Sequence, residues 1–141
     1  MIRITKLTDY GVVLMAFMAS HPLRLFQARE LAEYTAVAHP TVSKLLKKLA
    51  KNKLLISHRG THGGYLLACR PEEISVAELV NALEGPIAIT DCNRGHQYCP
   101  TASQCAIKTP WQQINHVITE ALASVKLSDL VNKLRLAGEV S

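Results

Sequence analysis

Residues 40–52 carry the most regular two-sided pattern in the chain. Their apolar side chains recur at steps of three and four residues, which is the spacing of one helix face. These are Val42, Leu45, Leu46 and Leu49. The opposite face holds Thr41, Lys44, Lys47, Lys48 and Lys51. Because Pro40 suits a first helical turn, the pattern predicts a helix with one face in a core and a basic face turned outward.

Two further helices are predicted before this segment. Residues 6–19 are amphipathic, and residues 27–34 form a short helix with Leu31 as its apolar anchor. Only residues 35–38 connect that helix to the basic one. Two helices joined by so short a turn form the helix-turn-helix arrangement that places a recognition helix in the major groove of DNA. An ordinary three-helix packing unit has the same periodicity, so helix periodicity alone does not separate these two interpretations.

Two short strands are predicted next, at residues 54–58 and 65–69. Between them, residues 59–64 include three glycines, which permit the positive φ angles of a hairpin tip. A hairpin beside a recognition helix is the wing of a winged helix-turn-helix. We expect Arg59, at its tip, to enter the narrow and electronegative minor groove.

The basic residues are concentrated in the N-terminal half. Residues 1–70 have a net charge of +8, whereas residues 71–141 have a net charge of −3. This asymmetry favours a polyanionic partner, although a solvated lysine-rich face would give the same composition. The longest apolar run is eight residues, against about 18 for a membrane span. With no secretory signal either, we expect a cytoplasmic protein without a membrane partner.

Two more helices are predicted in the C-terminal half. Ser75 and Glu78 form a capping box that opens a helix to about residue 83, and Thr109 and Pro110 open another. The second of these helices carries an apolar seam: Trp111, Ile114, Ile118, Ala121 and Val125. The seam favours packing on a second subunit, with packing on the protein's own core as the alternative. A last short helix is predicted at residues 128–136.

Residues 85–108 show no sustained periodicity and contain three of the four cysteines. Cys92, Cys99 and Cys105 are separated by six and five residues. Thiolates bind iron–sulfur clusters or zinc, and bound metal supplies the ordering free energy that a core would otherwise provide. Loose thiols or a regulatory disulfide are open alternatives, because the Cys-x2-Cys pairs of common zinc folds are missing. Cys69, in the second strand, is expected to be a small buried hydrophobe.

A cluster with four protein ligands needs one more than these cysteines. The candidates are His96 in the same segment, Asp9 on the first helix, Glu84 just before the segment, and an external thiol or water. With His96 the set would be Cys3His, which zinc accepts equally well.

Several motifs match a known family. They are Thr8-Asp9-Tyr10-Gly11, residues 58–67, Leu83-Glu84-Gly85-Pro86 and the three-cysteine segment. Together they resemble the bacterial iron–sulfur regulators typified by IscR and NsrR, over nearly the whole chain. Within that family, residues 85–92, the cysteine spacing and Trp111-x-x-Ile114-Asn115 are most similar to the branch that regulates the SUF cluster-assembly system.

The resemblance implies a homodimeric winged helix-turn-helix repressor. Its cluster, 2Fe-2S or 4Fe-4S, is held by Cys92, Cys99 and Cys105 and controls operator binding. IscR has a histidine three residues after the last cysteine, where this chain has Lys108, so that ligand does not carry over. In NsrR-like members an aspartate of the other subunit completes the cluster, and Asp9 matches its position. The alternative for Asp9 is a first-turn acid stabilised by the helix dipole.

The expected fold is mainly α with a small β-hairpin wing. We expect a DNA-binding domain at residues 1–84, a cluster-binding loop at 85–108, and a dimerisation helix with a C-terminal tail at 109–141. The first turn of the recognition helix reaches deepest toward the bases, and the later lysines meet phosphates. The expected contacts to double-stranded DNA are His39, Thr41, Ser43, Lys44, Lys47, Lys48 and Arg59.

Competing functions share parts of this pattern. A sensor of nitric oxide or redox state, or a repressor controlled by zinc or a disulfide, would keep the DNA-binding half. A small electron-transfer protein would use the cysteines but would need no basic wing. The chain has no Gly-x4-Gly-Lys, Gly-x-Ser-x-Gly or His-Glu-x-x-His motif, so we expect no enzyme.

Overall fold

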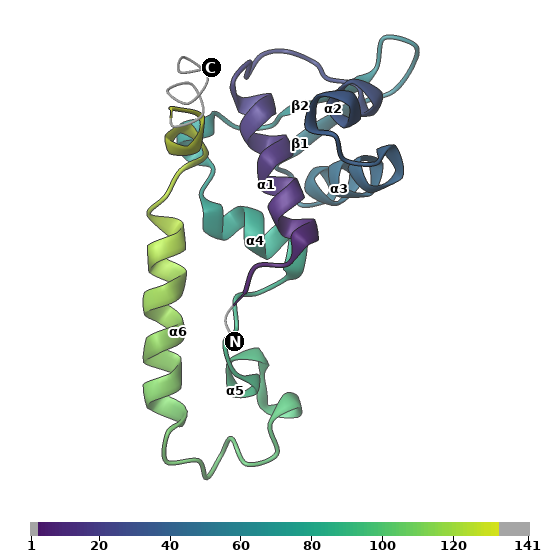
Figure 1. The fold of residues 1–141 in the computed structure, drawn as a ribbon. Coiled ribbons are helices and arrows are strands. Elements are labelled where there is room, and N and C mark those ends of the chain that lie inside the picture. The colour runs from purple at the N-terminus through teal and green to yellow at the C-terminus, as the bar shows by residue number, and fades with distance from the viewer. Residues whose placement is uncertain (1–2, 133–141) are drawn as a thin grey trace.

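Helices α1 to α4 and a two-stranded hairpin pack into one body, and α6 stands along its side (Figure 1). The computed structural model describes residues 3–132, apart from the side chain of His96. In chain order the elements are α1 (Lys6–Ala19), α2 (Ala28–Thr35), α3 (His39–Lys51), β1 (Leu55–His58), β2 (Gly64–Leu67), the 3-10 turn η1 (Pro71–Glu73), α4 (Val76–Glu84), α5 (Asp91–Arg94), the 3-10 turn η2 (His96–Tyr98) and α6 (Lys108–Ala123). The predicted fold class, mainly helical with a small hairpin, is confirmed.

The core lies between the first four helices and the inner side of the hairpin. Its largest fully buried side chains are Phe26, Leu14, Met15, Met18, Leu31, Leu45, Leu46, Leu49, Ile74, Leu79, Leu127 and Val42. The whole apolar stripe of α3 is at most 1% exposed, and burying one such side chain stabilises the fold by about 1.5–3 kcal/mol. This burial fixes which face of α3 is left for solvent.

The turn between α2 and α3 is short, as predicted. α2 ends at Thr35, and Ala36 adopts a left-handed conformation with φ of 58°. Ala38 then precedes α3, and Pro40 lies in its first turn, where no intrahelical N–H is needed. The helix-turn-helix is therefore built by one left-handed residue and one proline.

The hairpin is joined to the rest of the fold through its backbone. β1 and β2 pair antiparallel, with His58 opposite Gly64 at the tip. Phe26, between α1 and α2, pairs with Tyr65 on the other side of β2 and so adds a third segment of backbone beside the hairpin. Its amide donates to the Tyr65 carbonyl at 2.8 Å, and its carbonyl accepts from the Tyr65 amide at 2.7 Å. The position of the hairpin thus depends on the connection that precedes α2.

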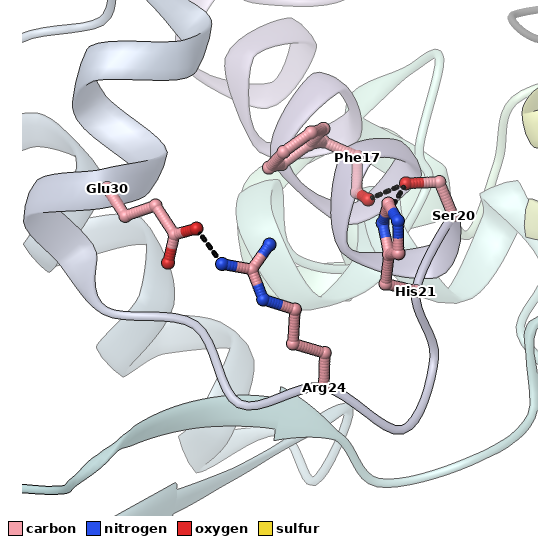
Figure 2. A network of polar contacts seen from close by, with 5 residues as sticks. All are labelled: Phe17, Ser20, His21, Arg24 and Glu30. Carbon is pink, nitrogen blue, oxygen red and sulfur yellow. Dashed lines mark hydrogen bonds and ion pairs between the residues drawn. The ribbon is translucent and has the colours of Figure 1, made fainter.

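That connection is itself held by polar contacts, which Figure 2 shows. The Ser20 hydroxyl donates to the Phe17 carbonyl at 2.6 Å and so closes the end of α1. Arg24 pairs with Glu30 at the start of α2, and its guanidinium lies 4.5 Å from the centre of the Phe26 ring. These contacts help to hold Phe26 beside β2.

The prediction that Cys69 is buried is wrong. β2 ends at Leu67, and Cys69 is exposed in the stretch that leads to η1. Leu67 is the last residue of the strand on the buried side. Since the chain bends away after it, Cys69 does not continue the alternation of buried and exposed side chains.

The predicted capping box of α4 is confirmed. The Ser75 amide donates to the Glu78 carboxylate at 2.8 Å, and the Glu78 amide donates to the Ser75 hydroxyl at 3.1 Å. Residues 125–127 return to this helix start, where the Val125 carbonyl accepts from the Val76 amide at 2.9 Å. The end of the described chain is thereby tied to the core.

α6 differs in detail from the prediction. It begins at Lys108 with Ile107 in the cap position, so Thr109 does not cap it, and it ends at Ala123, before Val125. Helical backbone resumes over residues 127–132, and the remainder of the predicted helix at 128–136 lies outside the described residues. Within residues 3–132, no helix has the length and hydropathy that crossing a bilayer requires.

Candidate nucleic-acid interface and cysteine segment

The outer side of α3 carries three exposed lysines, Lys44, Lys47 and Lys51, which we call the basic face. The buried stripe holds the opposite side of the helix in the core, so these side chains point to solvent. None of the three makes a hydrogen bond or an ion pair with another described residue. Unpaired ammonium groups on one helix face attract phosphate.

The first turn of α3 gathers polar side chains next to the basic face. His39 is exposed, and Thr41 and Ser43 are half-buried. Among the described residues, neither of the two hydroxyls has a hydrogen-bond partner. The predicted base-reading residues therefore lie together at the N-terminal end of the helix, with free donors and acceptors.

Arg59 lies at the hairpin tip, directly after β1, and is exposed. The tip is closed by the Gly63 amide, which donates to the Gly60 carbonyl at 2.9 Å. α3 contacts β1, so the basic face and the hairpin belong to the same part of the molecule (Figure 1). The arrangement offers one helix and one arginine to a common partner.

Lys48 is also exposed, but unlike the other three lysines of α3 it makes a hydrogen bond with another described residue of the chain. Its ammonium group donates to the carbonyl of Leu83, near the end of α4, at 2.7 Å. The structure therefore directs Lys48 to α4, although the sequence pattern grouped it with the DNA contacts.

Glu84 ends α4 and reaches the start of α1. Its Oε1 accepts from the amide of Thr5 at 3.0 Å and from the hydroxyl of Thr5 at 2.7 Å. The Thr8 hydroxyl lowers the pKa of Glu84 most, and the donors of Thr5 and the charge of Lys48 lower it further, against desolvation, which raises it. These groups favour its charged form, and its Oε1 is occupied by the donors of Thr5 at the α1 cap.

The three cysteines of residues 85–108 are half-buried free thiols. Cys92 belongs to α5, and its Sγ lies 3.0 Å from Thr90 Oγ1. Cys99 follows η2, and its Sγ lies 3.6 Å from Thr101 Oγ1. The segment is aperiodic, as predicted, but it includes two single helical turns.

The donor set fits an iron–sulfur cluster or zinc in its chemistry, since it offers three thiols without a disulfide. The described residues do not gather it into a centre: no three His, Cys, Asp or Glu side chains among them lie together as metal ligands. Asp9 is exposed in the first turn of α1, and it lines a groove beside Val12 and Leu122. The side chain of His96 lies outside the described part of the chain.

Asn115 holds the start of this segment against α6. Its Oδ1 accepts from the Ile89 amide at 2.9 Å, and its Nδ2 donates to the Ile87 carbonyl at 3.0 Å. Sequence reasoning used Asn115 only as part of a family motif and missed this role. An amide four residues after Trp111, at the edge of the apolar seam, is the signal that would have indicated it.

α6 has no buried residue over its length. Trp111, Ile114 and Val117 are 37%, 44% and 65% exposed. Trp111 also lines a groove toward α4, together with Ile118 and Leu122. The predicted seam is therefore divided, with one side toward the chain's own core and an apolar side left open.

Comparison with known proteins gives this architecture a family. Residues 4–133 match the Rrf2 model, described as an iron-dependent transcriptional regulator. The HTH-type transcriptional regulator IscR of Pectobacterium atrosepticum is 31% identical over 134 residues, which are 92% of this chain and 79% of the relative. Protein rrf2 of Nitratidesulfovibrio vulgaris is 28% identical over 138 residues, with 95% and 90% covered.

Solved structures agree with the sequence relatives. CymR, the global cysteine regulator of B. subtilis, is similar with a TM-score of 0.74 at 25% identity, over 94% of this chain and 98% of that one. IscR of T. potens has a TM-score of 0.73 at 26% identity, over 96% and 90%. These proteins are regulators of transcription and not enzymes. The chain belongs to the Rrf2 family of winged-helix transcriptional regulators.

Proposed function

We propose that the chain is a homodimeric repressor of genes for the SUF iron–sulfur cluster-assembly system, and that it senses cluster status through its cysteine segment. The observation that carries DNA binding is the exposed basic face of α3 beside an exposed Arg59. In this proposal residues 1–84 bind DNA, residues 85–108 hold the cluster and residues 109–141 dimerise. A repressor acts on chromosomal DNA, so we place it in the cytoplasm.

Each subunit presents α3 to a major groove. The first turn of a recognition helix approaches the base edges, so Thr41, Ser43 and Lys44 are the proposed base-reading side chains. Lys47 and Lys51 lie further along the same face and meet phosphates, with His39 at the edge of the contact. Arg59 enters the flanking minor groove, where the negative potential is strongest.

A second copy of this chain is the proposed partner of α6. A helix in water gains most of its stability from a covered apolar face, yet Ile114 and Val117 are 44% and 65% exposed. Pairing of two α6 helices would cover this side. It would also hold two α3 helices at a fixed separation of about 34 Å, or a multiple of it, as successive major grooves require.

Cys92, Cys99 and Cys105 are the proposed cluster ligands, with Asp9 of a second copy as the fourth. When bound, a cluster of either type, 2Fe-2S or 4Fe-4S, supplies an iron centre that iron scarcity or oxidation can remove. The protein's own residues connect this segment to both neighbours, since Asn115 fixes its start on α6 and Glu84 fixes the preceding helix end on α1. DNA affinity is expected to differ between loaded and unloaded protein, because a ligand shifts an equilibrium only by binding two states unequally.

Other signals would use the same DNA-binding residues. A sensor of nitric oxide or redox state would keep the cluster, whereas zinc or a disulfide would replace it. Iron and sulfide analysis of protein isolated without air separates a cluster from zinc, and titration of free thiols identifies a disulfide. Membership of a family of transcriptional regulators argues against the alternative function, a small electron-transfer protein.

The wing gives the most direct test of DNA binding. We expect Arg59→Ala to weaken binding to the protein's own promoter by about 1–3 kcal/mol, as loss of a groove contact does. Arg70→Ala is the matched control, since Arg70 is also exposed but lies beyond the other end of the hairpin and pairs with Glu73. If Arg59→Ala and Arg70→Ala bound the promoter with equal affinity, the proposed contact between the hairpin and DNA would be refuted.

A further inference from the structure

The C-terminal end of α4 receives side chains from α3. The last four carbonyls of an α-helix have no partner inside the helix. In α4, the Ala82 carbonyl accepts from Asn52 Nδ2 at 3.4 Å, and the Leu83 carbonyl accepts from Lys48 Nζ at 2.7 Å. Two helices far apart in sequence are thus joined at their C-terminal ends.

The contact suits a charged donor. The C-terminal end of a helix carries partial negative charge, so a lysine side chain there is favourable. The charge of Lys48 is also one of the groups that lower the pKa of Glu84, after the Thr8 hydroxyl and the donors of Thr5. Glu84 in turn holds the cap of α1 through Thr5. We call the contacts of Lys48 and Asn52 with the end of α4 the α3–α4 joint. Through Glu84 this joint is also connected to α1.

Directional contacts of α3 are concentrated at this joint. Elsewhere α3 packs through its buried apolar stripe, and apolar contacts are non-directional. Lys48 lies in the last turn of the helix and Asn52 is its C-cap. A hydrogen bond at that end limits the tilt of the whole helix, including the first turn, where the proposed base-reading residues lie.

We infer that Lys48 is a positioning residue, which sets the angle of α3 against α4 and does not contact phosphate. The inference rests on the proposed use of α3 as the recognition helix. It divides the α3 lysines into two classes, since Lys44, Lys47 and Lys51 remain free for DNA while Lys48 is engaged within the chain. Loss of Lys48 should therefore impair sequence discrimination, whereas loss of Lys47 should impair electrostatic attraction.

The test compares Lys48→Met with Lys47→Met on the full-length protein. One duplex is selected by the wild type from a random pool, and the other is a scrambled duplex of equal composition, both titrated at several salt concentrations. Lys47→Met should reduce the slope of log affinity against log salt by about 0.9 per lost phosphate contact and leave discrimination unchanged. Lys48→Met should keep the slope and lose about tenfold in discrimination, which is the worth of one well-placed base contact.

A second measurement needs no DNA. Amide hydrogen exchange at residues 83–85 should be faster in Lys48→Met than in the wild type and unchanged in Lys47→Met, and Lys48→Arg should restore both exchange and discrimination. If Lys48→Met does not fold, Lys48→Gln, which keeps a hydrogen-bond donor but loses the charge, decides: it should keep the salt slope of the wild type, whereas loss of a phosphate contact would reduce that slope. A reduced salt slope in Lys48→Met with intact discrimination and unchanged exchange would overturn the inference. A wild type that binds no duplex would refute the proposed function, and exchange alone would then decide whether Lys48 holds α3 on α4.

Discussion

Gly64 lies where the backbone of the hairpin closely approaches the connection between α1 and α2. A Cβ at this position would stand 2.5 Å from the Phe26 carbonyl oxygen, and the residue has φ of 155°. The neighbouring Tyr65 makes both backbone hydrogen bonds to Phe26. A single side-chain carbon would therefore push the hairpin off its support.

We expect Gly64→Ala to destabilise the fold by about 2–3 kcal/mol, from two lost backbone hydrogen bonds and a positive φ. Gly60→Ala is the matched control, because Gly60 has φ of 107° but nothing within 4 Å of an added Cβ. That variant should lose only about 1 kcal/mol. Urea unfolding measures both, and equal losses would contradict the importance of the Phe26 contact.

Glu84 gives a pH-dependent prediction at the same scale. Its pKa is lowered from the usual 4.5, so its charged form adds stability that is complete above that value and is lost as the pH falls through the lower folded-state pKa. Glu84→Gln should thus be less stable than the wild type at neutral pH, and the difference should fade as the pH falls below 4.5.

Denaturation over a pH series checks this difference between Glu84→Gln and the wild type. Glu72→Gln is the control, because Glu72 is exposed and makes no hydrogen bond to another described residue. A stability difference for Glu84→Gln that persists unchanged into acid would show that the Thr5 contacts do not depend on the charge.

The role of Lys48 was partly available from the sequence. At about 100° per residue, Lys44, Lys47 and Lys51 fall opposite the apolar stripe, whereas Lys48 falls at its flank. That placement separates the two classes of lysine. The partner could not be predicted, because the Leu83 carbonyl lies on a helix that only the tertiary fold brings near.

At the scale of elements, local patterns predicted the helices and the hairpin of residues 1–84 well. The stripe of α3, the proline in its first turn and the glycines of the hairpin each act within a few residues, and the observed elements agree with them. α6 was less predictable. Asn115 bonds to Ile87 and Ile89, contacts that no helical period encodes, and the seam divides between two directions.

We expect the double variant Ile114→Glu/Val117→Glu to be monomeric while keeping its helix content. Both side chains are exposed on α6, 44% and 65%, so two charges there should block pairing without disturbing the core. A monomer would contact the promoter through one recognition helix instead of two, so its promoter affinity should fall by roughly 100-fold or more.

Light scattering gives the mass of the variant, and Gln112→Glu, at an exposed polar position of the same helix, is the control. A double variant that keeps the mass of the wild type would exclude this side of α6 as the dimer contact.

For the whole molecule, the sequence predicted the fold class and the separation of basic and cysteine-containing halves. It predicted the thiols at Cys92, Cys99 and Cys105 as a set, yet the described residues do not bring three ligands together. Ordering such a segment takes free energy that, in the proposed function, comes from bound metal and a second copy.

The most direct test of the whole account measures metal content and DNA affinity on the same sample. Protein isolated without air should contain iron and sulfide, and its affinity for its own promoter should change by about tenfold when a chelator removes the iron. Cys99→Ala should lack both the iron and the change. Wild-type protein that is colourless and metal-free, yet binds the promoter as tightly before chelation as after, would contradict the account.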